Sequence, residues 1–394
     1  MKNKRSMSIS NTSAPFSNTD IQHTLQNVLH QRKEEDLLRY LQVNEGLIDF
    51  CSNDYLSFAR SKKIREQTNQ YADKLKPTSG STGSRSISGN TSFAEELEQF
   101  LANFHNSEAA LLFNSGYDAN VGFFSCIATK HDTIICDELI HASIIDGCRL
   151  SYANRFRFQH NNMFDLEKKL QLAQGNIFVA VESVYSMDGD IAPLQEVVQL
   201  CKKYNANLVV DEAHATGVFG SNGKGLVNHF QLENDVFARV HTFGKAMGCH
   251  GAVIVGSAVL RNYLINFARS FIFTTALPIH SLISIRVAYE QLMESGFNNT
   301  HLHQLIQHFK QHWNNCNDTC LIDGICPVQS LIIPGSERAR NIAGRLQKQG
   351  FDVRAIIPPS VPKGKERLRI SLHMHNTFNE IDQLQSALKA ILNT

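Results

Sequence analysis

From Ala109 onward the chain alternates between short apolar runs and stretches in which apolar residues recur at helical spacing. The apolar runs predict strands over residues 110–113, 133–136, 178–181, 208–210, 238–242 and 252–255. Helices are expected over residues 117–128, 141–150, 165–174 and 193–204. Because near-continuous apolar strands must be covered on both faces, this alternation predicts an α/β fold with a mostly parallel central sheet.

The flanking segments predict additions at both ends of that sheet. We expect a flexible tail over residues 1–20, an N-terminal arm over 21–50, a large α/β domain over 51–285 and a small C-terminal α+β domain over 286–394. The arm is expected to contain an amphipathic helix over 21–41 and a short strand over 47–51, and a further helix over 93–104 is expected to be capped by Ser92. The small domain should hold strands over 328–333, 353–357 and 368–372 and helices over 337–349 and 379–392.

The charge balance argues against two classes of partner. Lys and Arg number 38 against 37 Asp and Glu, so no field of one sign favours nucleic acid or a membrane surface. No run of 18 apolar residues predicts a membrane-spanning helix, and the first 20 residues lack the apolar core of a secretory signal. The nine cysteines are scattered without a CxxC pair, which predicts no metal site and a reducing, cytoplasmic location.

Polar residues that directly follow the predicted strands are the candidate site, because ligands of such sheets bind beyond the carboxyl ends of the strands. Asn114-Ser115-Gly116-Tyr117 opens a helix, where free N–H groups and the helix dipole suit a phosphate. An ordinary capped helix start is the alternative. His141 follows the next strand and can lie flat on an aromatic cofactor, although a lone histidine is more often packed or solvated.

Asp211 comes directly after the apolar run 208–210, where it is poorly solvated and needs a cation. The protonated nitrogen of a pyridine ring would serve, and that pair would keep the ring an electron sink for a carbanion. His214 could reach the phenolic oxygen of the same ring. A metal site made by Asp211 and His214 is the competing interpretation, but the sequence offers no further close set of ligands.

Lys245 lies in a loop of small residues between the apolar runs 236–240 and 252–255. Desolvation lowers the pKa of a lysine, and a neutral amine can condense with an aldehyde. Our hypothesis is that Lys245 carries pyridoxal phosphate (PLP) as a Schiff base. A lysine that reaches water from a Gly-rich turn is the simpler interpretation of this loop taken alone. The order of phosphate cradle, histidine, aspartate and lysine along one sheet favours PLP.

The chain resembles the fold-type I PLP enzymes and, within them, the α-oxoamine synthase family. The resemblance covers nearly the whole chain from about residue 21. It is carried by the motifs Ser52-Asn53-Asp54-Tyr55-Leu56, Asn114-Ser115-Gly116-Tyr117-Asp118-Ala119-Asn120, His141-Ala142-Ser143, Ser186-Met187-Asp188-Gly189-Asp190, Asp211-Glu212-Ala213-His214, Thr242-Phe243-Gly244-Lys245 and Phe273-Thr274-Thr275-Ala276-Leu277-Pro278.

The resemblance implies a role for each candidate residue. Lys245 would hold PLP and move the proton, Asp211 would pair with the pyridine nitrogen, and His141 would stack on the ring. His214, and with it Ser183, would contact the ring oxygen. The phosphate would be bound by the Gly116 and Tyr117 backbone, by Thr242 and, across a homodimer interface, by Thr274 or Thr275. Substrate would be bound by Asn53 and Arg369, which grip the amino-acid carboxylate, and by Arg39 and Ser360.

The segment Pro358-Pro359-Ser360-Val361-Pro362 and the pair Asn53-Asp54 are most similar to members that condense L-alanine with a pimeloyl thioester in biotin synthesis. That reaction releases CO₂, and the thioester would be carried by CoA or by an acyl carrier protein. A relative that joins glycine and acetyl-CoA is the first alternative. A catalytically silent partner subunit is the second, and the joint presence of the lysine, the aspartate and both histidines argues against it.

Overall fold

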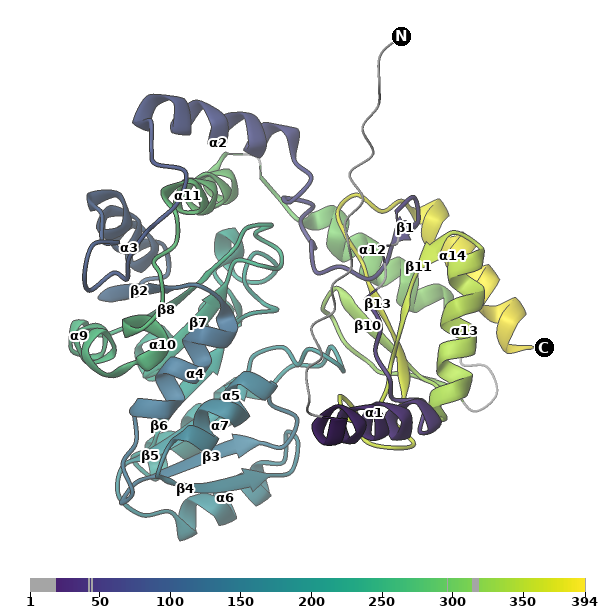
Figure 1. Ribbon diagram of the computed structural model, residues 1–394, viewed down its shortest axis with the longest axis horizontal. Helices are drawn as coiled ribbons and strands as arrows, with labels where there is room; N and C mark the ends of the chain where they lie inside the picture. Colours follow the sequence, from purple (N-terminus) through teal and green to yellow (C-terminus); the bar gives the residue numbers. More distant parts are fainter. Residues whose placement is uncertain (1–18, 42, 44, 296, 314–318, 394) are drawn as a thin grey trace.

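The computed structural model describes residues 19–41, 43, 45–295, 297–313 and 319–393. Figure 1 shows a larger body, built on a seven-stranded sheet, beside a smaller body that contains the C-terminal helices. The strands of the larger sheet lie in the order β2-β8-β7-β6-β5-β3-β4. Their bounds are Ala109–Phe113 (β2), Thr133–Asp137 (β3), Asn154–Phe158 (β4), Ile177–Glu182 (β5), Asn207–Asp211 (β6), Ala238–Thr242 (β7) and Ala252–Gly256 (β8).

The larger sheet is parallel except at β8, which runs antiparallel to both β2 and β7. The mostly parallel α/β fold expected from the sequence is therefore confirmed. The register places Glu182 at the end of β5 directly beside Asp211 at the end of β6. Because β2, β3, β5, β6 and β7 run in one direction, the residues that follow them meet at one edge of the sheet.

Apolar side chains on both faces of this sheet form two separate cores. On β5, Phe178 and Ala180 belong to one core, whereas Val179 and Val181 belong to the other. Successive side chains of a strand point to opposite faces, so a run of four apolar residues needs cover on both sides. This requirement explains why helices lie on the two faces of the sheet (Figure 1).

The helices of the larger body include several that begin close to where the sequence predicts them. The helices of this body are α2 (Lys62–Leu75), α3 (Ser92–Phe104), α4 (Gly116–Cys126), α5 (Ala142–Leu150), α6 (Met163–Leu172), α7 (Leu194–Lys203), α8 (Leu226–His229), α9 (Ala258–Phe267), α10 (Arg269–Ile272) and α11 (Ile279–Met293). The expected cap of α3 is wrong by one residue. The hydroxyl of Thr91, not that of Ser92, accepts the N–H of Ala94 at 3.2 Å.

Strand β4 and helices α2, α8, α9 and α10 have no counterpart in the sequence prediction. Strand β4 pairs only with β3 and reads Asn-Arg-Phe-Arg-Phe, which lacks the apolar run of a central strand. Edge strands carry charged side chains because one side faces water. Helix α2 buries only Ile64 and Thr68 and packs against α11, so its apolar pattern is weak.

The smaller body contains a second sheet in the order β12-β13-β10-β9. Its strands are β9 (Cys320–Leu321), β10 (Val328–Ile332), β12 (Arg354–Ile356) and β13 (Arg367–Ser371), and its helices are α12 (Thr300–His312), α13 (Ser336–Lys348) and α14 (Phe378–Leu392). Strand β1 (Ile48–Asp49), from the N-terminal part of the chain, pairs in parallel with β11 (Phe351–Asp352). The smaller body is thus completed by residues from the other end of the sequence, and the domain boundaries stay a prediction.

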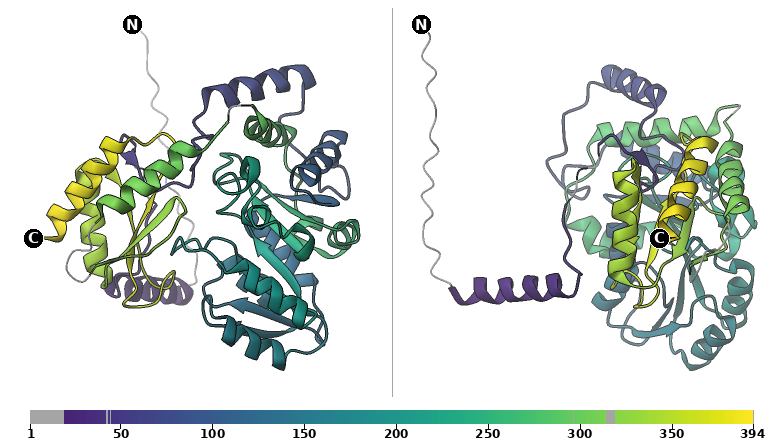
Figure 2. Two further views of the ribbon diagram at one scale, coloured as in Figure 1. Left: turned by 180° about the vertical axis from the view of Figure 1, so that it is seen from behind. Right: turned by 90° about the vertical axis from the view of Figure 1, so that its right-hand side faces the viewer.

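Helix α1 (Thr19–Glu34) is shorter than the helix expected over residues 21–41. Asp36 adopts a left-handed φ of 54°, and the N–H of Leu37 returns to the carbonyl of Arg32, which ends the helix. Figure 2 shows α1 extending away from both bodies. Four of its apolar side chains, Ile21, Leu25, Val28 and Leu29, are exposed and form an apolar stripe. Residues 1–18 of the expected tail lie outside the described residues, whereas Thr19 and Asp20 are helical.

The search for a membrane-spanning helix gave a negative result. Within the described part of the chain, no helix combines the length and apolar character that crossing a bilayer requires.

Candidate active site

The start of α4 lies against the end of β7 and forms a cradle for an anion. Ser115 caps the helix by accepting the N–H of Asp118 at 3.0 Å, which leaves the first backbone N–H groups of α4 without partners inside the helix. A side chain on Gly116 would come within 3.3 Å of the Thr242 side chain. The glycine therefore keeps open a space bounded by N–H groups and a hydroxyl, which suits a phosphate.

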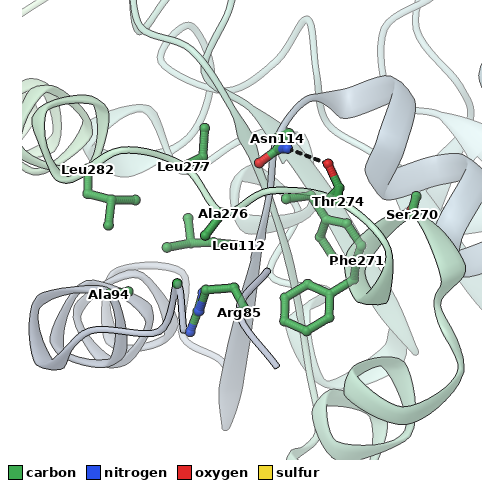
Figure 3. Close-up of a pocket in the computed structure, with 12 residues that line it drawn as sticks. Arg85, Ala94, Leu112, Asn114, Ser270, Phe271, Thr274, Ala276, Leu277 and Leu282 are labelled. Carbon is green, nitrogen blue, oxygen red and sulfur yellow. Dashed lines mark hydrogen bonds between the residues drawn. The ribbon is translucent and has the colours of Figure 1, made fainter. Parts of the chain in front are cut away.

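Thr274 and Thr275 are attached to the same corner through Asn114. The amide nitrogen of Asn114 donates to Thr274 Oγ1 and to the carbonyl of Thr275, both at 2.9 Å. Figure 3 shows Asn114 and Thr274 pointing toward each other beside a small pocket that also contains Arg85 and Phe271. The structure thus places both threonines beside Asn114, the residue before the cap of α4, in their own chain.

Asp211 and His141 are joined by a network that comes from helices α4 and α5. Asn120 Nδ2 donates to Asp211 Oδ2 at 2.8 Å and to Ser143 Oγ at 3.0 Å. The Ser143 hydroxyl lies 2.7 Å from His141 Nδ1. The protein around its ring lowers the pKa of His141, although the charge of Asp211 opposes this, so the imidazole is neutral and can pack against a protonated pyridine ring without charge repulsion.

His214 belongs to a second network that leads to Arg369. Tyr55 Oη lies 2.8 Å from His214 Nδ1 and donates to Asn53 Oδ1 at 3.0 Å. Arg369 donates to Asn53 Oδ1 at 2.9 Å, to Tyr55 Oη at 3.3 Å and to the carbonyl of Ser186 at 2.8 Å. Burial, with the positive charges of Lys245 and Arg369, holds the pKa of His214 well below its usual range. The Tyr55 hydroxyl therefore contacts both the cationic guanidinium of Arg369 and the neutral imidazole of His214.

Lys245 is a half-buried residue with an unusually acidic ammonium group. The protein packed around its amine lowers its pKa to about 8, although the negative charges of Asp211 and Glu182 act in the opposite direction. Burial and the neighbouring Asp211 raise the pKa of Glu182 to about 8 as well. A substantial neutral fraction of the amine is thus available near neutral pH, as nucleophilic chemistry requires.

Ser183 lies beside Asp211, because its hydroxyl donates to the Asp211 carbonyl at 3.3 Å, but no hydrogen bond joins it to His214 among the described residues. Its hydroxyl donates to Glu212 Oε2 at 2.8 Å, and Glu212 in turn accepts the N–H groups of Leu226 and Val227. The structure therefore places Ser183 with a loop anchor rather than with His214. Ser183 follows Glu182 by one residue, and neighbouring side chains of an extended segment point to opposite faces.

Arg39 and Ser360 are brought together from distant parts of the sequence. Arg39 Nη2 donates to Ser360 Oγ at 3.4 Å. Both residues are exposed, and Ser360 lines a cavity between the two bodies that also contains Tyr185 and Met187. Of the residues predicted as substrate contacts, Asn53 and Arg369 thus share one network, while Arg39 and Ser360 meet beside a separate cavity.

Sequence reasoning assigned no role to four residues that the structure places inside the site: Tyr55, Asn120, Ser143 and Glu182. Asn120 lies one helical turn after Gly116, so it shares a face of α4 with the phosphate cradle. Glu182 ends an apolar strand just as Asp211 does, and the same strand-end argument could have found it. Its Oε1 atom is buried and has no hydrogen-bond partner among the described residues.

Comparison with known proteins gives a consistent assignment. Residues 45–388 match the family model for aminotransferases of class I and II. An 8-amino-7-oxononanoate synthase from Emericella nidulans is 46% identical over 391 residues, covering 92% of this chain and 94% of its own sequence. An 8-amino-7-oxononanoate synthase from Francisella tularensis superposes with a TM-score of 0.75 at 31% identity, covering 89% of this chain and 98% of that one.

A further solved structure concerns the cofactor directly. A serine palmitoyltransferase variant from S. paucimobilis with bound PLP and myriocin superposes with a TM-score of 0.84 at 27% identity, covering 93% of this chain and 96% of that one. The residues of the present chain fit PLP, because an anion cradle, a buried carboxylate, a neutral imidazole and a lysine of low pKa surround one edge of the sheet. PLP is accordingly the cofactor, and the chain belongs to the α-oxoamine synthases, a branch of the PLP-dependent aminotransferase class I and II family.

Proposed function

We propose that this enzyme condenses L-alanine with a pimeloyl thioester to give 8-amino-7-oxononanoate, CO₂ and a free thiol, a step of biotin synthesis. The observation that carries the proposal is Arg369, which Asn53, Tyr55 and the Ser186 carbonyl fix beside the Lys245 and Asp211 group. A guanidinium held in one orientation binds a carboxylate through paired hydrogen bonds. The identity to an 8-amino-7-oxononanoate synthase over nearly the whole chain supports this substrate pair.

PLP, when bound, supplies an electron sink that stabilises negative charge at the alanine Cα. Asp211 would pair with its ring nitrogen, and Asn120 holds that carboxylate by donating at 2.8 Å. His141 would pack on the ring, His214 would contact the ring oxygen, and Gly116, Tyr117 and Thr242 would bind the phosphate. Fixing these groups before substrate arrives reduces the reorganisation needed during the reaction.

Lys245 would move the proton of the reacting carbon. Its neutral amine removes the proton from the alanine Cα, a step that the lowered pKa favours near neutral pH. The Cα then forms a bond to the acyl carbon, the C–S bond breaks, and the sulfur leaves as a thiolate that takes a proton from solvent. Arg369 holds the alanine carboxylate until the bond between Cα and that carboxylate breaks and CO₂ departs. The lysine ammonium returns a proton to Cα, so the lysine is regenerated as the free amine.

The proposal includes a homodimer with active sites at the subunit interface. The exposed apolar stripe of α1 and the exposed Phe273 next to Thr274 support it, because contiguous apolar surface is commonly covered by a partner. Thr274 or Thr275 would then reach the phosphate of the partner's site. We also propose a reducing compartment such as the cytoplasm, since the described cysteines are free thiols.

A side-by-side assay tests the substrate assignment. The purified enzyme with PLP is given either L-alanine and a pimeloyl thioester or glycine and acetyl-CoA, and the products are identified by mass. We expect product only from the first pair at a rate typical of an enzyme. Efficient turnover of the second pair would instead assign a 2-amino-3-ketobutyrate ligase activity. A protein that binds PLP yet converts neither pair would be a silent partner subunit.

A further inference from the structure

A large cavity adjoins the site on the side of the smaller body. Its volume is about 510 Å³, within the range of small-molecule sites. Three segments line it: the loop between β3 and α5, the turn over residues 185–188, and the proline-rich segment over residues 358–363. Both bodies of the protein therefore contribute to this cavity.

The cavity adjoins the catalytic residues, because several of its lining residues are sequence neighbours of site residues. Ile140 and Ala142 line it, and they flank His141 in the sequence. Met187 also lines it and follows Ser186, whose carbonyl accepts a hydrogen bond from Arg369. A substrate that reacts next to His141 can thus extend into the cavity without leaving the protein surface.

The cavity combines an apolar wall with charged side chains. Its carboxylates, Glu138 and Asp188, are engaged elsewhere, because Glu138 accepts the N–H of His160 at 3.0 Å and Asp188 pairs with Arg367. Leu139, Ile140, Ile145 and Met187 supply apolar surface. Arg157 and Lys363 also line it, and neither forms an ion pair with any residue in the described part of the chain.

Arg367, a third cation of the wall, behaves differently. It is buried, and its guanidinium pairs with Asp188 and donates to the carbonyl of Met187 at 3.2 Å. Its positive charge is therefore neutralised by an ion pair within the protein. The uncommitted cations are Arg157 and Lys363; both are exposed and line the same cavity as Ser360, the partner of Arg39.

We propose that this cavity binds the acyl donor, with Arg157 and Lys363 as the charge partners of an anionic group on that donor. The apolar wall would cover the methylene chain. The inference rests on the proposed function and adds two specificity-determining residues to it. Two groups of a pimeloyl thioester have the required chemistry, namely the carboxylate at the far end of the acyl chain and the phosphates of the thiol carrier. Either can accept paired hydrogen bonds from a guanidinium.

Three acyl donors separate these two sources in steady-state kinetics of the PLP-loaded enzyme. The donors are pimeloyl-CoA, its terminal methyl ester, and the pimeloyl thioester of N-acetylcysteamine, which has no phosphate. The variants are Arg157→Gln and Lys363→Gln. Arg155→Gln is the matched control, because it removes the same charge from the same strand β4 outside this cavity.

We expect each cavity variant to raise KM for pimeloyl-CoA roughly tenfold, the low end for losing a charge-assisted contact, with KM for L-alanine unchanged. One donor lacks the anionic group that the cations bind. With the wild type, that donor should already show the raised KM that the variants show with pimeloyl-CoA, and its KM should not rise further in the variants. The group missing from that donor is the one that the cations bind. The control should match the wild type with all three donors.

Two results would overturn the inference in distinguishable ways. If the wild type makes product but both cavity variants keep its KM for every donor, only the role of Arg157 and Lys363 is refuted. If the wild type makes no product from any of the three donors, the proposed function is refuted and this inference with it. A rise in KM for L-alanine equal to that for the donor would also count against a separate acyl subsite.

Discussion

The rate at which the enzyme without cofactor takes up PLP should follow the protonation of Lys245. Only the neutral amine attacks an aldehyde, so uptake should rise with pH and level off above the pKa of about 8. At pH 7.5 a pKa of 8 leaves roughly a quarter of the amine neutral, against about 0.1% for an ordinary lysine. The protein environment therefore accounts for roughly a 200-fold faster uptake at that pH.

The assay mixes cofactor-free protein with PLP between pH 6.5 and 9.5 and follows the absorbance of the lysine-bound cofactor at roughly 420 nm, the region expected from its chemistry. The rate should fall about tenfold for each pH unit below the midpoint. Borohydride reduction followed by peptide mass analysis should locate the modification at Lys245.

A substitution supplies the internal control for this reasoning. Glu182 raises the pKa of Lys245 when it is ionised, and its own pKa of about 8 leaves it roughly half ionised at the midpoint, so Glu182→Gln should move the midpoint of uptake modestly to lower pH. Glu66→Gln, which changes an exposed glutamate paired with Lys62 on α2, should leave the midpoint in place. A midpoint near that of an ordinary lysine, or a midpoint shifted upward by Glu182→Gln, would refute the electrostatic account.

Three further substitutions test other parts of the site. Lys245→Ala should lower turnover by several orders of magnitude and abolish the absorbance of the lysine-bound cofactor, and a variant that kept both would contradict the assigned role. Asn120→Ala removes the donor to Asp211; since a hydrogen bond to a charged group contributes about 1.5–3 kcal/mol, PLP should bind roughly 10- to 150-fold more weakly in equilibrium dialysis, and a change below threefold would count against the network. Gly116→Ala should weaken PLP binding because its Cβ would lie 3.3 Å from Thr242, yet thermal unfolding of the cofactor-free protein should show no loss of stability, since alanine favours a helix.

The sequence predicted the central sheet well because each buried strand requires a continuous apolar run. The same runs located Gly116, His141, Asp211 and Lys245, since each follows a strand or ends one. Strand β4 was missed because an edge strand with arginines at alternate positions has no such run. Local pattern therefore identifies elements whose two faces are buried more reliably than elements at an edge.

The contacts between segments could not be predicted from pattern alone. Tyr55 looks like a core aromatic in the sequence, and only the folded chain shows that its hydroxyl joins Asn53, His214 and Arg369. Ser183 is a further example, because its cofactor contact stays a prediction while the fold shows that its hydroxyl also donates to Glu212. Such pairings depend on side-chain direction at distant positions, which a single sequence does not encode locally.

The parallel pairing of β1 with β11 has a consequence for how the protein is made. Ile48 pairs with Phe351, and Asn53 receives its hydrogen bond from Arg369, so both contacts join the beginning of the chain to its end. At roughly 5–20 residues per second, the ribosome needs on the order of 15–60 s to add the intervening chain. Until then the strands of the larger sheet are all available, but the proposed carboxylate-binding group has no arginine. A nascent or prematurely terminated chain should therefore be able to bind PLP before it can recognise its amino acid.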